Sequence, residues 1–181
     1  MAPDDKDTLT LYQRALGPRF DVLPAVLHQF HGNQRGGTAA GAVSIIRGDG
    51  VVRNLAAELL RLPRAGKDVA ITVEIRVDGV GETWCRCFGG CRLITRQWLD
   101  RSFIVEQAGP LRLWFHVEAS SIGMRFDSMR CTLFGILMPN PMAFRVAAVV
   151  TGMAESWWVD VEIFAPMLGS LVRYEGEVFP N

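Results

Sequence analysis

The sequence predicts an α+β fold: a strongly curved antiparallel β-meander, a half-barrel or barrel of about seven to nine strands, packed against two or three N-terminal helices. Three observations predict it. Apolar residues recur with helical spacing before residue 62, they alternate with polar residues from Val69 onward, and short glycine-containing segments separate the alternating runs. We expect a single domain over residues 1–181, with helices mainly within 8–62 and the sheet mainly within 69–179.

The N-terminal helical region covers about residues 10–31, and Asp7, Thr8 or Thr10 can cap it. Gly17-Pro18 divides it into two short helices, because proline cannot donate a backbone hydrogen bond and disfavours helix at the residue before it. His28 and His31 close the second helix, where we expect cationic side chains to interact with the negative end of the helix dipole.

A further helix is predicted over residues 51–62, before Pro63. Its apolar side chains recur at intervals of three and four, as in a helix with one buried face. We expect that face to be Val52, Leu55, Leu59 and Leu62.

One strand is predicted before this helix, over residues 38–47, and period-two alternation dominates the chain after Asp68. The predicted strands cover residues 38–47, 69–77, 82–88, 91–99, 103–107, 111–119, 123–134, 144–150, 157–164 and 171–179, and we expect some of them to merge. A meander of this length twists until it curls or closes. The helices should then cover its open face or plug one mouth, and the sheet should enclose a packed core or a pocket for an apolar ligand.

Three cysteines lie close together in the sequence, at Cys85, Cys87 and Cys91. If Gly89-Gly90 is a two-residue hairpin turn, Phe88 pairs with Cys91. Cys91 then shares a face with Phe88, while Cys85 and Cys87 point the other way. Three ligands cannot converge in that arrangement, so we expect no metal site.

Motifs of the common catalytic templates are not found: G-x-S-x-G, H-E-x-x-H, a P-loop and a dinucleotide fingerprint do not occur. We therefore expect no cofactor and assign no catalytic residue. His116 lies on a predicted strand with Arg112 and Trp114 on the same face. It belongs either to a polar patch in a cavity or to the structural framework of that strand.

The formal net charge is zero, which argues against nucleic-acid binding. The apolar runs are far shorter than the roughly 20 residues of a membrane span. The N-terminal sequence MAPDDKDTLT has no positively charged head followed by an apolar run, so we expect no secretory signal and a cytoplasmic location.

Several segments together carry a family resemblance: LYQRALGPRFDVLPAVLHQFH, W-x-R-x-FGG, GPLRLWF and D-V-E-I-x-x-P-x-x-G. They resemble an uncharacterised bacterial family of domains of unknown function, over Leu11 to Gly176. Members of that family occur alone or at the C-terminus of proteins whose front half is similar to saccharopine dehydrogenase. The resemblance implies a metabolic setting and a saccharopine-dehydrogenase-like oxidoreductase as partner, and it implies no catalytic residues.

The leading hypothesis is non-catalytic binding of an apolar or lipid-like small molecule in a cavity of the curved sheet. Arginines on or beside the strands would orient an acidic head group, and the candidates are Arg86, Arg92, Arg96, Arg112 and Arg125. The ligand-binding residues predicted for it are Arg86, Arg112, Trp114, His116 and Tyr174. One alternative is a hydrolase or isomerase that uses Glu or Asp with His116 or Tyr174. Another is a docking module for an oxidoreductase, which would expose a large apolar patch.

Overall fold

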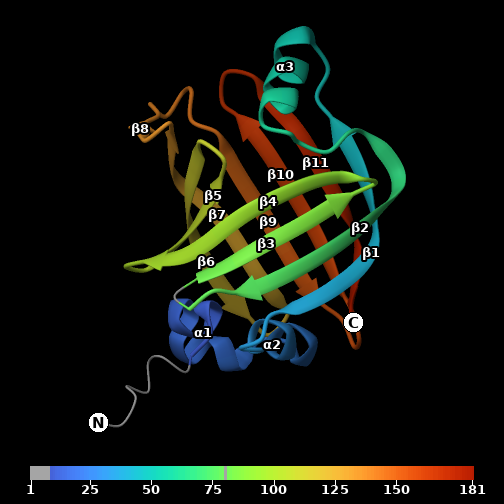
Figure 1. Ribbon diagram of the computed structural model, residues 1–181, viewed down its shortest axis with the longest axis vertical. Helices are drawn as coiled ribbons and strands as arrows, with labels where there is room; N and C mark the ends of the chain where they lie inside the picture. Colours follow the sequence, from blue (N-terminus) through green and yellow to red (C-terminus); the bar gives the residue numbers. More distant parts are fainter. Residues whose placement is uncertain (1–8, 80) are drawn as a thin grey trace.

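The computed structural model describes residues 9–79 and 81–181 and forms an antiparallel β-barrel (Figure 1). In these residues eleven strands follow the order β6-β5-β4-β3-β2-β1-β11-β10-β9-β7-β8, and β6 also pairs with β7, so ten strands close into a ring. The short β8 pairs with β7 alone. The strands are β1 (Gly37–Arg47), β2 (Gly66–Val77), β3 (Gly81–Phe88), β4 (Cys91–Asp100), β5 (Phe103–Ala108), β6 (Leu111–Ser120), β7 (Gly123–Leu133), β8 (Ile136–Leu137), β9 (Arg145–Gly152), β10 (Trp157–Ala165) and β11 (Gly169–Pro180).

The predicted α+β class with about seven to nine strands is wrong, whereas the prediction of a curved antiparallel meander that forms a barrel is confirmed. The predicted bounds of the sheet, mainly 69–179, do not include the separate strand predicted at residues 38–47. In the structure that strand is β1, and it lies in the sheet between β2 and β11. The expected merging does not occur. Tight turns that hold positive-φ residues, such as Gly89, Gly90, Arg101 and Gly109, separate several of the consecutive strands.

The barrel closes where β1 meets β11, with Ala39 opposite Pro180 and Arg47 opposite Val172. Two glycines allow a close approach at this seam. A Cβ atom on Gly41 would lie 2.0 Å from the backbone oxygen of Glu177, and one on Gly176 would lie 2.2 Å from that of Ala42. Closure leaves neither the first nor the last long strand as a free edge.

Three short helices lie across the lower end of the barrel in Figure 1: α1 (Leu11–Leu16), the 3₁₀-helix η2 (Gly17–Val22) and α2 (Ala25–His31). Thr10 caps α1 in a capping box with Gln13, while Asp7 and Thr8 lie outside the described residues. Their buried side chains, including Phe20 and Leu27, join the core cluster of the barrel. The helices therefore plug one mouth of the barrel (Figure 1), with their apolar side chains turned toward its core.

The fourth helix, α3 (Val51–Leu59), lies at the opposite end and connects β1 to β2 (Figure 1). Its predicted buried face is wrong for three of four residues. Val52, Leu55 and Leu59 are exposed, while Leu62, beyond the helix, is buried. The inner side of the helix is made instead by the small residue Ala57. Among the described residues, no helix has the length and apolar character that crossing a membrane requires.

Candidate functional site

A cavity of about 200 Å³ occupies the interior of the barrel. It runs from the plugged end, where Tyr12 and His31 line it, to the α3 end, where Leu60 and Leu62 line it. An apolar cavity of about 150 Å³ is large enough to bind benzene. The space inside this barrel is therefore sufficient for a small organic ligand.

The cavity is apolar because strand alternation sends every second side chain inward. On β10 the inward residues are Trp157, Val159, Val161 and Ile163, and on β6 they are Leu111, Leu113 and Phe115. Aliphatic and aromatic groups from β7 and β9 complete this wall. Such a surface favours the apolar part of a ligand and gives it no specific orientation.

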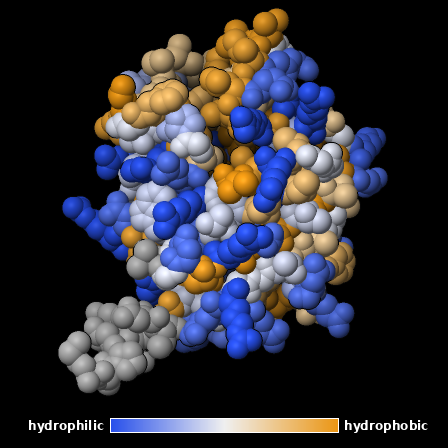
Figure 2. All heavy atoms as spheres, in the orientation of Figure 1, coloured by the Kyte–Doolittle hydropathy of each residue, from blue (hydrophilic) through white to orange (hydrophobic). Residues whose placement is uncertain are grey.

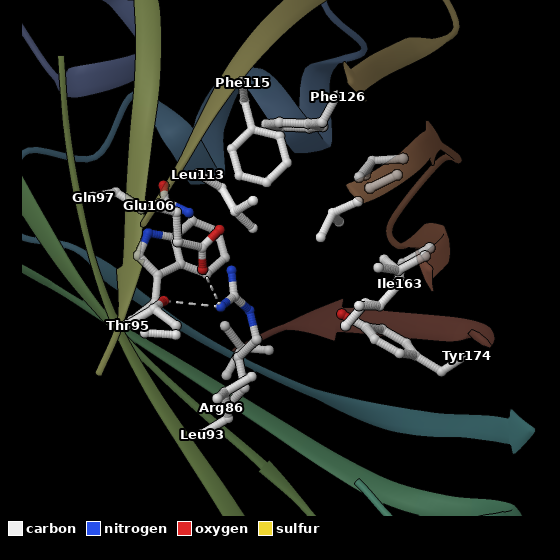
Figure 3. Close-up of a pocket in the computed structure, with 18 of the residues that line it drawn as sticks. Arg86, Leu93, Thr95, Gln97, Glu106, Leu113, Phe115, Phe126, Ile163 and Tyr174 are labelled. Carbon is white, nitrogen blue, oxygen red and sulfur yellow. Dashed lines mark hydrogen bonds and ion pairs between the residues drawn. The ribbon is translucent and has the colours of Figure 1, made fainter. Parts of the chain in front are cut away.

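Polar groups gather on the wall formed by β3, β4 and β5 (Figure 3). Arg86 Nη1 donates to Glu106 Oε1 at 2.8 Å and to Thr95 Oγ1 at 3.0 Å. The guanidinium also lies over the ring of Trp84, with Cζ 4.6 Å from its centroid. Figure 3 shows Tyr174 of β11 across the cavity from Arg86, with its hydroxyl turned toward the same space. These residues give the cavity one polar region.

The ion pair keeps both partners charged despite their burial. Burial alone would raise the pKa of Glu106, but the charge of Arg86 and hydrogen bonds involving Thr95, Arg86 and Gln97 outweigh it and hold that pKa below its usual range. Burial raises the pKa of Tyr174. The phenol is therefore a neutral hydrogen-bonding group at physiological pH, and the polar region carries no net charge.

The floor of the cavity is built from aromatic rings and neutral polar groups. Tyr12 donates from its hydroxyl to Gln97 Oε1 at 3.1 Å. His31 packs against Tyr12 with ring centroids 4.1 Å apart, and its Nδ1 is buried without a hydrogen-bond partner. Burial lowers the pKa of His31 to about 3. The prediction of a cationic His31 at the helix end is therefore wrong.

We expect the free energy of unfolding of His31→Gln to decrease less than that of the wild type as the pH is lowered. The pKa of His31 is about 3 in the folded state and 6.5 in the unfolded chain. Below pH 6.5 the unfolded state therefore binds more protons than the folded state, and the stability of the wild type decreases as the pH is lowered. Between about pH 7.5 and about pH 5 this amounts to about 2 kcal/mol that the variant should not lose. Urea unfolding of both proteins at the two pH values measures it.

Glu82 is the internal control for this experiment. Burial raises its pKa to about 7. Its contribution is present below the unfolded pKa of 4.5 and is lost as pH rises through 7, which is the opposite slope to that of His31. Because Glu82 is common to both proteins, its effect cancels in the comparison. Identical pH dependence in wild type and His31→Gln would contradict the neutral, buried state of His31.

The five predicted ligand-binding residues separate into two groups in the structure. Arg86 and Tyr174 both line the cavity. Arg112, Trp114 and His116 lie on the outer face of β6, because the neighbouring residues of that strand point inward. There Arg112 stacks on the rings of Trp98 and Trp114, and Trp114 Nε1 donates to Asp100 Oδ2 at 2.9 Å. His116 Nε2 lies 3.5 Å from Glu118 Oε1 at the surface.

The cysteines follow the predicted register. Phe88 pairs with Cys91 across the Gly89-Gly90 turn, so Cys91 shares a face with Phe88. Cys85 lies on the outer face, where its sulfur accepts a hydrogen bond from Arg92 Nε at 2.9 Å. In the part of the chain that the structure describes, no group of three or more His, Cys, Asp or Glu side chains is placed to hold a metal ion.

Several polar residues of the cavity wall and floor are not among the predicted ligand-binding residues, including Tyr12, His31, Thr95, Gln97 and Glu106. The pairing of β3 with β4 could have revealed two of them, Thr95 and Gln97. The register that sets Phe88 opposite Cys91 also sets Trp84 opposite Thr95 and Glu82 opposite Gln97, on the face of Arg86. Tyr12 and His31 come from the plugging helices, whose docking the strand pattern does not determine.

The fold and the cavity define the class of protein: a closed antiparallel β-barrel with an apolar interior and one polar region on its wall. The chain belongs to the family described as Domain of unknown function (DUF4166), which matches residues 23–178. This match confirms the resemblance to a family of domains of unknown function. Comparison with curated proteins and with solved structures gave no match.

Proposed function

We propose that this protein binds an apolar small molecule inside the barrel, with the polar end of the ligand at the Arg86–Glu106 pair. The observation that carries the proposal is the cavity itself, whose lining is aliphatic and aromatic except for the polar region and floor. Burial of apolar surface supplies the affinity, at about 25 cal/mol per Å², and the few polar groups supply the orientation.

The state of Arg86 selects the chemistry of the polar end. Its charge is already balanced by Glu106 at 2.8 Å, so a carboxylate ligand would bring a second, uncompensated negative charge into a buried region. A hydroxyl or carbonyl group adds no charge, and it can hydrogen-bond to Arg86 or to the Tyr174 hydroxyl. Of the five arginines predicted to orient an acidic head group, Arg86 lines the cavity and Arg112 lies on the outer face. The other three, Arg92, Arg96 and Arg125, are exposed on the outer face. We therefore favour a neutral ligand over an acidic one.

The geometry supports binding over the proposed acid–base chemistry. His116 lies on the outer face of β6, away from the cavity. Tyr174 lines the cavity, but its raised pKa keeps the phenol protonated and makes it a poor base at neutral pH. Glu106 is held by Arg86 and is not free to exchange a proton. Ligand binding requires only that Tyr174 and Glu106 keep these protonation states, and it requires no contribution from His116.

We expect Ala148→Phe to abolish binding of 1-decanol in isothermal titration calorimetry. Ala148 lines the cavity, and a phenylalanine ring there occupies the space that the alkyl chain needs. The matched control is Ala147→Phe, one residue away on β9, outside the cavity lining. This control should bind as the wild type does.

Decanoate in the same experiment tests the preference for a neutral head group. We expect it to bind more weakly than 1-decanol by about tenfold or more, the equivalent of about 1.4 kcal/mol. Equal binding by both Phe variants would show that the alcohol does not enter the barrel. Tighter binding of decanoate would overturn the assignment of a neutral polar end.

Two further predictions concern the cellular setting. Docking on a saccharopine-dehydrogenase-like oxidoreductase and a cytoplasmic location both stay predictions from the sequence. The four cysteines, all free thiols in the structure, fit a reducing compartment. Co-purification of the full chain from its native host, with identification of any associated dehydrogenase, tests the partner.

A further inference from the structure

Exposed apolar side chains concentrate at the α3 end of the barrel (Figure 2). On α3, Val51 is 84% exposed and Leu59 is 78% exposed. Across the mouth, in the connection from β7 to β9, Phe134 is 78% exposed and Ile136 71%. The apolar mouth, as defined here, consists of Val51, Val52, Leu55, Leu59, Phe134, Ile136, Leu137, Met142 and Met167.

Specific contacts hold α3 in the orientation that exposes its large apolar side chains to solvent. Arg47, at the end of β1, pairs with Glu58 at 2.8 Å and donates from Nε to the backbone oxygen of Pro63 at 2.8 Å. It also donates from Nη2 to the backbone oxygen of Leu62. Leu62 is buried and lines the cavity. This anchoring holds the helix with its large apolar side chains in solvent, where such side chains mark an interaction site.

Basic side chains accompany the apolar ones. A groove beside the mouth, between the α3–β2 connection and the β3–β4 turn, is lined by Arg61, Arg64, Arg92 and Glu58. Glu58 is already paired with Arg47. Residues 47–68 together with Arg92 hold six basic and three acidic side chains, although the chain as a whole is neutral. The mouth therefore combines protruding apolar groups with a local excess of positive charge.

We propose that the apolar mouth docks on the surface of a lipid bilayer that contains anionic headgroups. Leu55 and Leu59 of α3 and Phe134 across the mouth enter the boundary between headgroups and acyl chains, while Arg61 and Arg64 contact the phosphates. The apolar and basic groups together match an anionic membrane surface, whereas a neutral apolar partner would have no use for the basic groups.

Continuity with the cavity strengthens the choice of a membrane. Leu60 and Leu62, directly after α3, line the interior space. An apolar molecule in the bilayer would thus meet an apolar path from the acyl chains to the barrel, with no exposed passage through water. Docking itself needs no ligand in the cavity, so it stands apart from the proposed ligand binding.

Co-sedimentation of the full chain with vesicles tests the proposal. The probes are vesicles of phosphatidylcholine alone and of an equimolar mixture with phosphatidylglycerol. We expect the wild type to bind the mixed vesicles at least about tenfold more strongly than the neutral ones, and to lose that difference at high salt. Leu55→Glu with Leu59→Glu should reduce binding to the mixed vesicles about tenfold or more. Arg61→Glu with Arg64→Glu should remove the preference for phosphatidylglycerol.

The matched control is Ile122→Glu, because Ile122 is 70% exposed but lies in the β6–β7 turn at the plugged end. It should bind vesicles as the wild type does. Ala148→Phe, which fills the cavity, should also keep vesicle binding, so failure of ligand binding and failure of docking are distinguishable. Circular dichroism confirms the fold of each variant.

Three results would overturn the proposal. The first is a wild-type chain that binds neither type of vesicle. The second is Ile122→Glu losing as much binding as Leu55→Glu with Leu59→Glu. The third is a dimer in light scattering that becomes monomeric in the latter variant without vesicles, since the mouth would then be a contact between two copies of the chain.

Discussion

Replacing Arg86 by methionine is expected to lower the free energy of unfolding at pH 8 by about 3 kcal/mol or more. The substitution leaves the Glu106 carboxylate without its cation in a region where only 17% of its side-chain surface remains accessible. Arg86→Met with Glu106→Leu removes both charges and should recover most of the loss, because replacing a whole buried pair by apolar residues is often neutral. Urea unfolding followed by circular dichroism measures both.

The pH dependence identifies the cause of the loss. In the wild type the pKa of Glu106 is lowered, so its contribution is present above the unfolded pKa and is lost as pH falls through the folded one. Without Arg86, burial raises that pKa above the unfolded value, and the sign reverses. Arg86→Met should therefore be least destabilised, relative to wild type, in acid. The control Arg173→Met, which breaks an exposed pair with Asp160, should leave stability nearly unchanged. A loss that is the same at every pH would contradict this account.

Valine at position 41 is expected to destabilise the barrel by about 3 kcal/mol or more, because it overfills the seam between β1 and β11. The added Cβ would lie 2.0 Å from the backbone oxygen of Glu177, and a backbone atom cannot move aside as a flexible side chain can. The strand pairing itself would have to shift. Thermal and urea unfolding measure the effect.

Ala42→Val is the matched control for Gly41→Val. Ala42 is the next residue of the same strand and its side chain is exposed on the outer face. A β-branched residue suits an exposed strand position, so stability should change little. Equal losses in the two variants would show that the close approach at Gly41 does not limit the seam.

The positions of the strands could be predicted from the sequence because two local signals agree. Ile71, Val73 and Ile75 alternate with polar residues, and tight glycine turns such as Gly89-Gly90 end the strands. Closure could not be predicted in the same way. Whether β1 pairs with β11 depends on the curvature of the whole sheet, and no short segment of sequence encodes that curvature.

The site was predictable only in part, for a related reason. Alternation groups the residues of one strand by face, so it sets Arg112, Trp114 and His116 together, but it does not say which face is inside. The inner face of β6 carries Leu111, Leu113 and Phe115. The helix α3 shows a different limit. Its spacing correctly indicates an amphipathic helix, yet the apolar stripe faces solvent at the mouth instead of the core.

The pairing of β1 with β11 also determines when the interior comes into existence. The other pairings of the barrel join strands that are next to each other in the chain, or nearly so, as where β7 meets β9 across the short β8. One edge of β1 pairs with β2, but the other edge has no partner until β11, the last strand, is made. Until β11 is available, the inward side chains of β1 and β10 lie beside two unpaired edges. Long-range closure of this kind is slow and follows the local hairpins. A newly made chain therefore passes through an open sheet with its apolar concave side uncovered, and it is in this period that the protein is most exposed to aggregation.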